Sequence, residues 1–143
     1  MAGVPFHYVE FRTFSYATED DQAVERALRT FLPEDTEIEG VVTEGHHGDP
    51  ILVLSVRLET ADEVRAVLDR LGDLPAAEQE RLLAELDERV DEDTNLFVSF
   101  DKQAAARGEI RLGEGISFRA KVEAYPAKQP AAVENAREAL EAL

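Results

Sequence analysis

The sequence predicts an α+β domain in which a mainly antiparallel sheet carries helices on one face. Two observations lead to this prediction. Segments with the two-residue alternation of a strand are interspersed with segments whose apolar residues recur at helical spacing. Short turns join several of the strands, so hairpins are expected rather than a fully parallel sheet. A chain of 143 residues is typical of one domain, which we expect to span residues 1–143.

The first strand is expected within residues 7–17, which are rich in aromatic and β-branched side chains. Thr18 is predicted to cap the helix that follows, with Asp21 as its capping-box partner. The apolar side chains of this helix recur on one face up to Phe31.

A hairpin is expected next, because the turn-rich stretch 45–50 separates two apolar strands at 37–44 and 51–58. Thr60 and Glu63 then have the spacing of a capping box, which predicts a second helix. A glycine at position 72 is the natural end of that helix.

The second half is predicted to hold one longer helix, further strands and a final helix. The longer helix begins near Pro75 and includes residues up to about Val90. Tyr125 is expected to lie at the edge of the core, with stacking on an RNA base as the alternative. The remaining segments are a strand at 96–100, a helical turn at 101–108, a short strand at 109–112, a strand at 116–125 and a helix at 130–143.

The composition is strongly acidic, with 31 acids against 15 bases and a net charge of -16. Twelve of the bases are arginine; the lysines are Lys102, Lys121 and Lys128. Acids in place of surface lysines are typical of proteins that work in concentrated salt, where charge repulsion is screened. We therefore predict a halophilic source.

No apolar run approaches the length of a transmembrane helix, and residues 1–6 do not form a basic segment followed by an apolar one. We expect no membrane association and a cytoplasmic location. The chain has no cysteine, which excludes disulfides, thiolate metal sites and cysteine nucleophiles.

No motif indicates catalysis. The chain lacks a Gly-x-Ser-x-Gly elbow, a Walker loop and a Gly-x-Gly-x-x-Gly turn. His46 and His47, with Asp49, form the one cluster that resembles a metal site, but adjacent side chains of an extended backbone point in opposite directions. We expect no enzyme, no cofactor and no metal. Both histidines remain candidates for RNA contact, since imidazole stacks on bases and donates to phosphate.

The excess of acids over bases is absent from one segment, residues 101–128. This segment has six bases and four acids, whereas the rest of the chain has nine bases and 27 acids. All three lysines lie within it, and Arg119 and Lys121 fall on the same face of a predicted strand. The segment is therefore a candidate anion-binding surface. Its bases are Lys102, Arg107, Arg111, Arg119, Lys121 and Lys128.

The same region resembles an archaeal family of small RNA-binding proteins that are described as predicted exosome-associated subunits. The resemblance rests on Asp101–Ala105, Gly108–Leu112 and Lys121–Lys128, and it extends to Glu44–Leu52 and Leu86–Asp91. It implies a fold like that of a large-subunit ribosomal protein and a non-catalytic role in RNA processing or degradation.

Two functions follow as hypotheses. The first is an RNA-binding accessory protein that uses the bases of 101–128, with His46 and His47, and belongs to an RNA-processing complex or does ribosome-related work. The alternative is a protein-interaction module, a homodimer or an accessory subunit that makes no direct contact with RNA.

Overall fold

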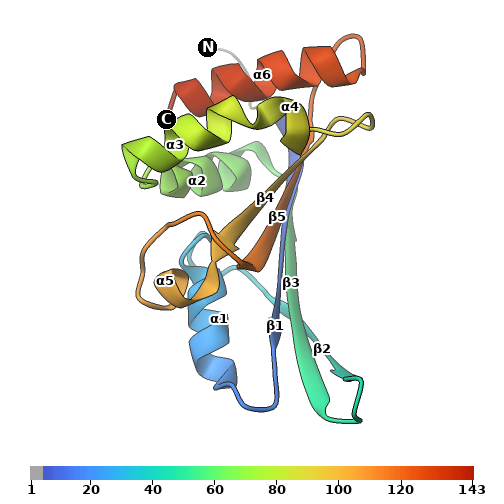
Figure 1. Ribbon diagram of the computed structural model, residues 1–143, viewed down its shortest axis with the longest axis vertical. Coiled ribbons are helices and arrows are strands. Elements are labelled where there is room, and N and C mark those ends of the chain that lie inside the picture. Colours follow the sequence, from blue (N-terminus) through green and yellow to red (C-terminus); the bar gives the residue numbers. More distant parts are fainter. Residues whose placement is uncertain (1–4) are drawn as a thin grey trace.

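The structure, a computed structural model, describes residues 5–143 as a sheet of five strands covered by helices on one face (Figure 1). All neighbouring strands are antiparallel, in the order β2-β3-β1-β5-β4. The predicted α+β class is confirmed. The elements are β1 (Phe6–Ser15), α1 (Asp21–Arg29), β2 (Glu39–Glu44), β3 (Pro50–Leu58), α2 (Ala61–Leu71), α3 (Ala76–Ala84), α4 (Leu86–Arg89), β4 (Asn95–Asp101), α5 (Lys102–Ala106), β5 (Gly115–Val122) and α6 (Gln129–Glu141).

The expectation that residues 1–6 hold no signal sequence rests mainly on residues 1–4, which lie outside the described residues. Within residues 5–143, no helix has both the length and the apolar character needed to cross a membrane.

The middle of the sheet is β1, which pairs with β3 on one side and β5 on the other. Successive side chains of a strand point to opposite faces. On β1, Val9 and Phe11 are buried against the helices, whereas Glu10 and Arg12 lie on the uncovered face. The same alternation on β3, β4 and β5 gives the sheet one buried and one open face.

Four phenylalanines form the centre of the core. The ring of Phe11 lies 5.1 Å from that of Phe31 and 5.0 Å from that of Phe118, measured between centroids. Phe100 completes the cluster, 4.9 Å from Phe31 and 6.0 Å from Phe118. These separations fall in the range at which aromatic pairs add to simple area burial. The cluster therefore joins three strands to the chain that follows α1.

The capping box of α2 is confirmed, because Thr60 accepts from the backbone N–H of Glu63 while the Glu63 carboxylate accepts from that of Thr60. The predicted cap of α1 is wrong. Asp20, not Thr18, precedes that helix, and its carboxylate accepts from the N–H of Gln22 at 3.0 Å. Threonine and aspartate both cap well, so the sequence alone did not distinguish them.

Three other local predictions need correction. The long helix after Pro75 is divided at Glu85 into α3 and α4. Residues 109–112 form an isolated bridge from Leu112 to Phe100 and no strand. Tyr125 is 95% exposed instead of lying at the core edge, because β5 ends at Val122 and the chain leaves the sheet before position 125.

Lys102 connects the start of α5 to the end of β1. Its Nζ donates to the backbone carbonyl of Phe14 at 2.9 Å and lies 2.9 Å from a carboxylate oxygen of Glu19. Burial acts to raise the pKa of Glu19, but hydrogen bonds from Lys102 and from the Tyr16 N–H, with the Lys102 charge, outweigh burial and leave that pKa lowered. Lys102 is thus largely occupied by a contact within the fold.

The phenylalanine cluster predicts a large loss of stability for Phe118→Ala, about 3–5 kcal/mol, because the cavity opens at the centre of the core. Phe97→Ala removes the same atoms from the open face of the neighbouring strand and should cost less than about 1 kcal/mol. Urea denaturation of both variants in concentrated KCl measures the difference. Equal losses would contradict the assignment of the buried face.

The Lys102–Glu19 contact predicts a pH-dependent contribution to stability. A lowered folded-state pKa stabilises the protein above the unfolded-state value of about 4.5, and this stabilisation is lost as the pH falls through the folded-state pKa. Lys102→Met should therefore cost about 1–3 kcal/mol at neutral pH and less in acid. Urea denaturation from pH 7 downward tests this, with Lys128→Met at an exposed position as the control. A deficit that does not shrink in acid would contradict the role given to Glu19.

Candidate nucleic-acid interface

The uncovered face of the sheet is built from the outward side chains of all five strands, since the register places Glu39 and Val41 of β2 on the same side as Ser55 of β3. On β1 these are Tyr8, Glu10, Arg12 and Phe14, at a spacing of two residues. We call this surface, together with the outward residues of the neighbouring strands, the open face. The neighbours contribute Ser55 and Arg57 from β3, Ser117, Arg119 and Lys121 from β5, and Phe97 and Ser99 from β4.

Strand register places these side chains in rows across the sheet. Glu10 lies directly opposite Arg57 on β3 and Arg119 on β5, and Arg119 in turn lies opposite Phe97 on β4. In the next row, Arg12 lies between two serines. Side chains directly opposite one another in antiparallel strands are near enough to interact. The neighbouring side chains within each row can therefore interact with one another.

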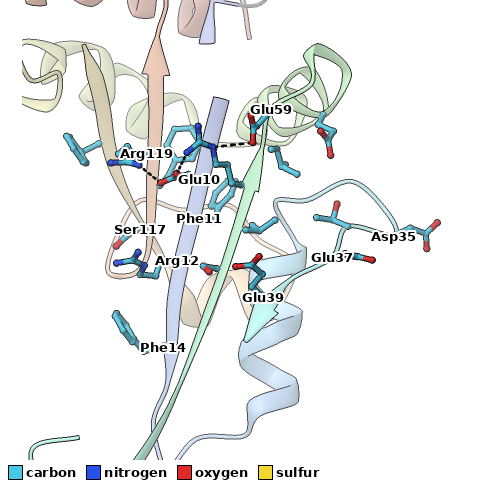
Figure 2. Close-up of a pocket in the computed structure, with 18 residues that line it drawn as sticks. Glu10, Phe11, Arg12, Phe14, Asp35, Glu37, Glu39, Glu59, Ser117 and Arg119 are labelled. Atoms are coloured by element: carbon cyan, nitrogen blue, oxygen red, sulfur yellow. Dashed lines mark hydrogen bonds and ion pairs between the residues drawn. The ribbon is translucent and has the colours of Figure 1, made fainter. Parts of the chain in front are cut away.

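A broad concavity of about 1160 Å³ lies over these rows. Figure 2 shows Arg12, Glu10 and Arg119 projecting from the strands on one side of it. Acids from the loop before β2, from the start of β2, from the residue after β3 and from α2 line the other side, so the hollow has a basic and an acidic margin. The acids are Asp35, Glu37, Glu39, Glu59 and Glu63.

Glu10 holds two of the arginines. Its carboxylate oxygens accept from Arg119 at 2.5 Å and from Arg57 at 3.2 Å (Figure 2 draws the Arg119 contact). The Arg57 guanidinium also lies over the ring of Tyr8, 3.7 Å from the centroid, and within 3.5 Å of Glu59. Stacking and ion pairing together fix the planes of the two guanidinium groups. The Nε of Arg119 is buried without a partner among the described residues.

Arg12 differs from both of these arginines. It is exposed, and none of the ion pairs found among residues 5–143 involves it. The residues opposite it are Ser55 and Ser117, whose small hydroxyl side chains leave room beside the guanidinium. A guanidinium free of carboxylates and flanked by hydroxyls is suited to bind a phosphate through two parallel hydrogen bonds.

Two phenylalanines on this face are unusually exposed. Phe14, on the same side of β1 as Arg12, is 37% exposed, and Phe97 on β4 is 45% exposed. The ring of Tyr16 stacks near that of Phe14 at 6.3 Å. Aromatic rings open to solvent on a sheet provide surfaces on which unpaired bases stack. The open face thus combines stacking surfaces with a free arginine.

The bases proposed from the sequence do not converge. Arg119 and Lys121 lie together on the open face, where Lys121 donates to the backbone carbonyl of Asp93. The others lie elsewhere: Lys102 is engaged with Glu19, Arg107 lies 3.7 Å from Glu109, Arg111 is bound to Glu78 of α3 at 2.6 Å, and Lys128 precedes α6.

His46 and His47 lie in the turn between β2 and β3, with ring centroids 4.9 Å apart and edge to face. They are at the end of the hairpin, away from the arginines of β1 and β5. In the part of the chain that the structure describes, no three His, Asp or Glu side chains are grouped as a metal site would need.

Sequence reasoning missed Arg12, Arg57, Phe14 and Phe97. A signal was present in the first strand, where positions 8, 10, 12, 14 and 16 carry only aromatic or charged side chains. A strand with its outer positions filled by tyrosine, phenylalanine and arginine is unusual for a merely solvated face. The contributions of β3 and β4 had no such signal, because their place beside β1 depends on pairing.

Three known proteins are similar to this chain over nearly its whole length. An RNA-binding protein from Pyrococcus abyssi is 40% identical over 99% of this chain and 98% of its own length. A DUF54 family protein from Archaeglobus fulgidus has a crystal structure with a TM-score of 0.84 and 31% identity, covering 94% of this chain and 99% of that one. A DUF54 protein from Methanothermobacter thermautotrophicus has a TM-score of 0.76 and 38% identity, covering 94% and 98%.

These relatives are archaeal, and one of them is named for RNA binding. The two solved structures share the fold over 94% of this chain. A family model described as RNA binding also matches residues 8–122, which include all five strands of the sheet except the first two residues of β1. The chain belongs to this RNA-binding family.

Proposed function

We propose that this chain is an RNA-binding accessory protein that holds RNA on the open face without catalysing a reaction. The observation that carries the proposal is Arg12, an exposed arginine with no carboxylate partner among the described residues, set between Ser55 and Ser117 and two residues from the exposed Phe14 on the same strand. In a chain with a net charge of -16, a free cation in the middle of a sheet is the exception.

The chemistry of the face favours unpaired nucleotides. Phosphate binds Arg12 and the neighbouring hydroxyls, while bases stack on Phe14 and Phe97. Stacking and directed hydrogen bonds depend less on salt than counterion release does. This mode of binding therefore suits a protein whose acidity is matched to concentrated salt.

The acidic margin of the concavity directs the path of the RNA. Glu39 and Glu59 lie toward β2 and the end of β3, whereas Arg12, Arg119 and Lys121 lie on β1 and β5. Phosphates are repelled from the first side and attracted to the second. The RNA then crosses the face over β1, β5 and β4.

The wider role is also part of the proposal. The family membership and the resemblance described above support work in RNA processing or degradation, with association to an exosome-like complex or ribosome-related work as its setting. Incubation of labelled RNA with the protein, followed by analysis of RNA length, tests the non-catalytic role. Protein-dependent cleavage or modification of the RNA would overturn it.

Substitution of the free arginine or of an exposed phenylalanine should lower the affinity for RNA by similar factors. Arg12→Ala and Phe97→Ala should each weaken binding of a short labelled single-stranded RNA by about tenfold or more, measured by fluorescence anisotropy in molar KCl. Arg70→Ala is the control, because Arg70 is exposed on α2 and forms none of the ion pairs found in residues 5–143. It should bind as the wild type does.

Two results would sink the proposal. One is a wild-type protein that binds neither single-stranded nor structured RNA. The other is equal affinity in Arg12→Ala, Phe97→Ala and the wild type. Since both side chains are exposed, urea denaturation should show folded variants, so a loss of affinity is not a loss of structure.

The double ion pair of Glu10 predicts a gain of affinity. Glu10→Gln removes a negative charge from the centre of the face and releases Arg119 for phosphate, while Arg57 keeps its contact with Glu59. RNA affinity should rise several-fold, since hydrogen bonds to charged groups are worth about 1.5–3 kcal/mol and part of this is now available to the ligand. Anisotropy titrations of the variant and the wild type measure the change. A weaker complex would show that Glu10 positions the arginines for binding instead of occupying them.

A further inference from the structure

The two edges of the sheet are treated differently by the rest of the chain. The edge of β4 is covered by backbone hydrogen bonds at both ends. The N–H of Asp91 donates to the carbonyl of Asn95 at 3.0 Å, that of Gly113 to Ser99 at 3.2 Å, and the N–H of Asp101 donates to Arg111 at 2.9 Å. Covering of this kind prevents another strand from adding to an edge.

The edge of β2 has no such cover. Within residues 5–143, β2 pairs with β3 on one side and with no strand on the other, and all six of its residues are exposed. Val41 and Val42, on opposite faces of the strand, are 63% and 68% exposed. Figure 1 shows the β2–β3 hairpin at the lower right, at the border of the sheet. The strand therefore presents unpaired backbone groups between two exposed apolar side chains.

The charge around β2 restricts what can bind there. Between Arg29 and Arg57, the chain has six acids and neither lysine nor arginine. Two of the acids, Glu39 and Glu44, are the first and last residues of β2. Phosphates in direct contact with these carboxylates are repelled, since salt screens mainly charges farther apart than the Debye length. Two copies paired along this edge would bring together two strands that carry acids and no bases, which is likewise unfavourable.

We propose that the free edge of β2 binds an extended, basic segment of a partner protein, which adds to the sheet as a sixth strand. The backbone of that segment pairs with β2, its apolar side chains cover Val41 and Val42, and its Lys or Arg side chains meet Glu39 and Glu44. This is recognition by strand addition, in which main-chain hydrogen bonds give affinity and side chains give selectivity. The site does not depend on whether the open face binds RNA.

The test uses the folded protein, labelled with nitrogen-15, and synthetic peptides. The probe peptide has two central valines with an Arg at one end and a Lys at the other. Its addition in molar KCl should shift the backbone amide signals of β2 and β3 and slow the hydrogen exchange of β2. A peptide with Glu in place of both bases should bind at least several-fold more weakly.

A second control separates strand addition from simple charge attraction. A peptide of the same sequence with its alternate backbone amides N-methylated keeps every side chain but loses donors to β2. It should bind at least about tenfold more weakly, because several hydrogen bonds are lost together. The double variant Glu39→Gln/Glu44→Gln should likewise weaken binding of the unmodified peptide. Equal affinity of the methylated and unmethylated peptides would overturn the proposal.

Two further outcomes identify another occupant and would also overturn it. Sedimentation of the protein alone showing a dimer with protected β2 amides would assign the edge to a second copy. Shifts of the β2 amides on addition of short single-stranded RNA would assign it to RNA. Peptide binding should persist in Arg12→Ala, so loss of RNA binding and loss of strand addition are distinguishable.

Discussion

The packing of helices on a single face of the sheet is the constraint on which the rest of this structure depends. Because β1 is central and antiparallel to both neighbours, its alternate side chains are committed to opposite environments. Phe11 enters the aromatic core with Phe31, Phe100 and Phe118, and the residues between are left facing solvent. The open face is thus a direct consequence of how the core is formed.

Electrostatics then differentiates that face. At the middle of the open face, the carboxylate of Glu10 neutralises Arg57 and Arg119. The other acids of the concavity line one of its margins. Arg12, between two serines, forms no ion pair with any carboxylate of residues 5–143. A protein with this charge cannot rely on long-range attraction of RNA, so short-range stacking and directed hydrogen bonds are the interactions that its surface favours.

Local predictions were accurate where the signal is contained within a few residues. The β2–β3 hairpin, the capping box of Thr60 and the final helix are all present, because turn chemistry, caps and helical spacing act between neighbours in the chain. Predictions were wrong where the same few residues can form either of two local structures. Asp20 replaces Thr18 as the cap of α1, and residues 109–112 lie beside β4 with one bridge instead of forming a strand.

The sequence by itself determined the α+β class, most elements and the shared face of Arg119 and Lys121, since these follow from periodicity within one segment. A source in concentrated salt stays a prediction from the excess of acids over bases. Only the tertiary structure decided which bases meet. Residues 101–128 pass from a strand through a helical turn and a loop to another strand. Their bases therefore meet different partners: Lys102 binds Glu19, Arg111 binds Glu78 of α3 and Arg119 binds Glu10 of β1. Arg12, Arg57 and Phe97 are far apart in the chain, and they share a face because strand pairing brings β3, β1, β5 and β4 side by side.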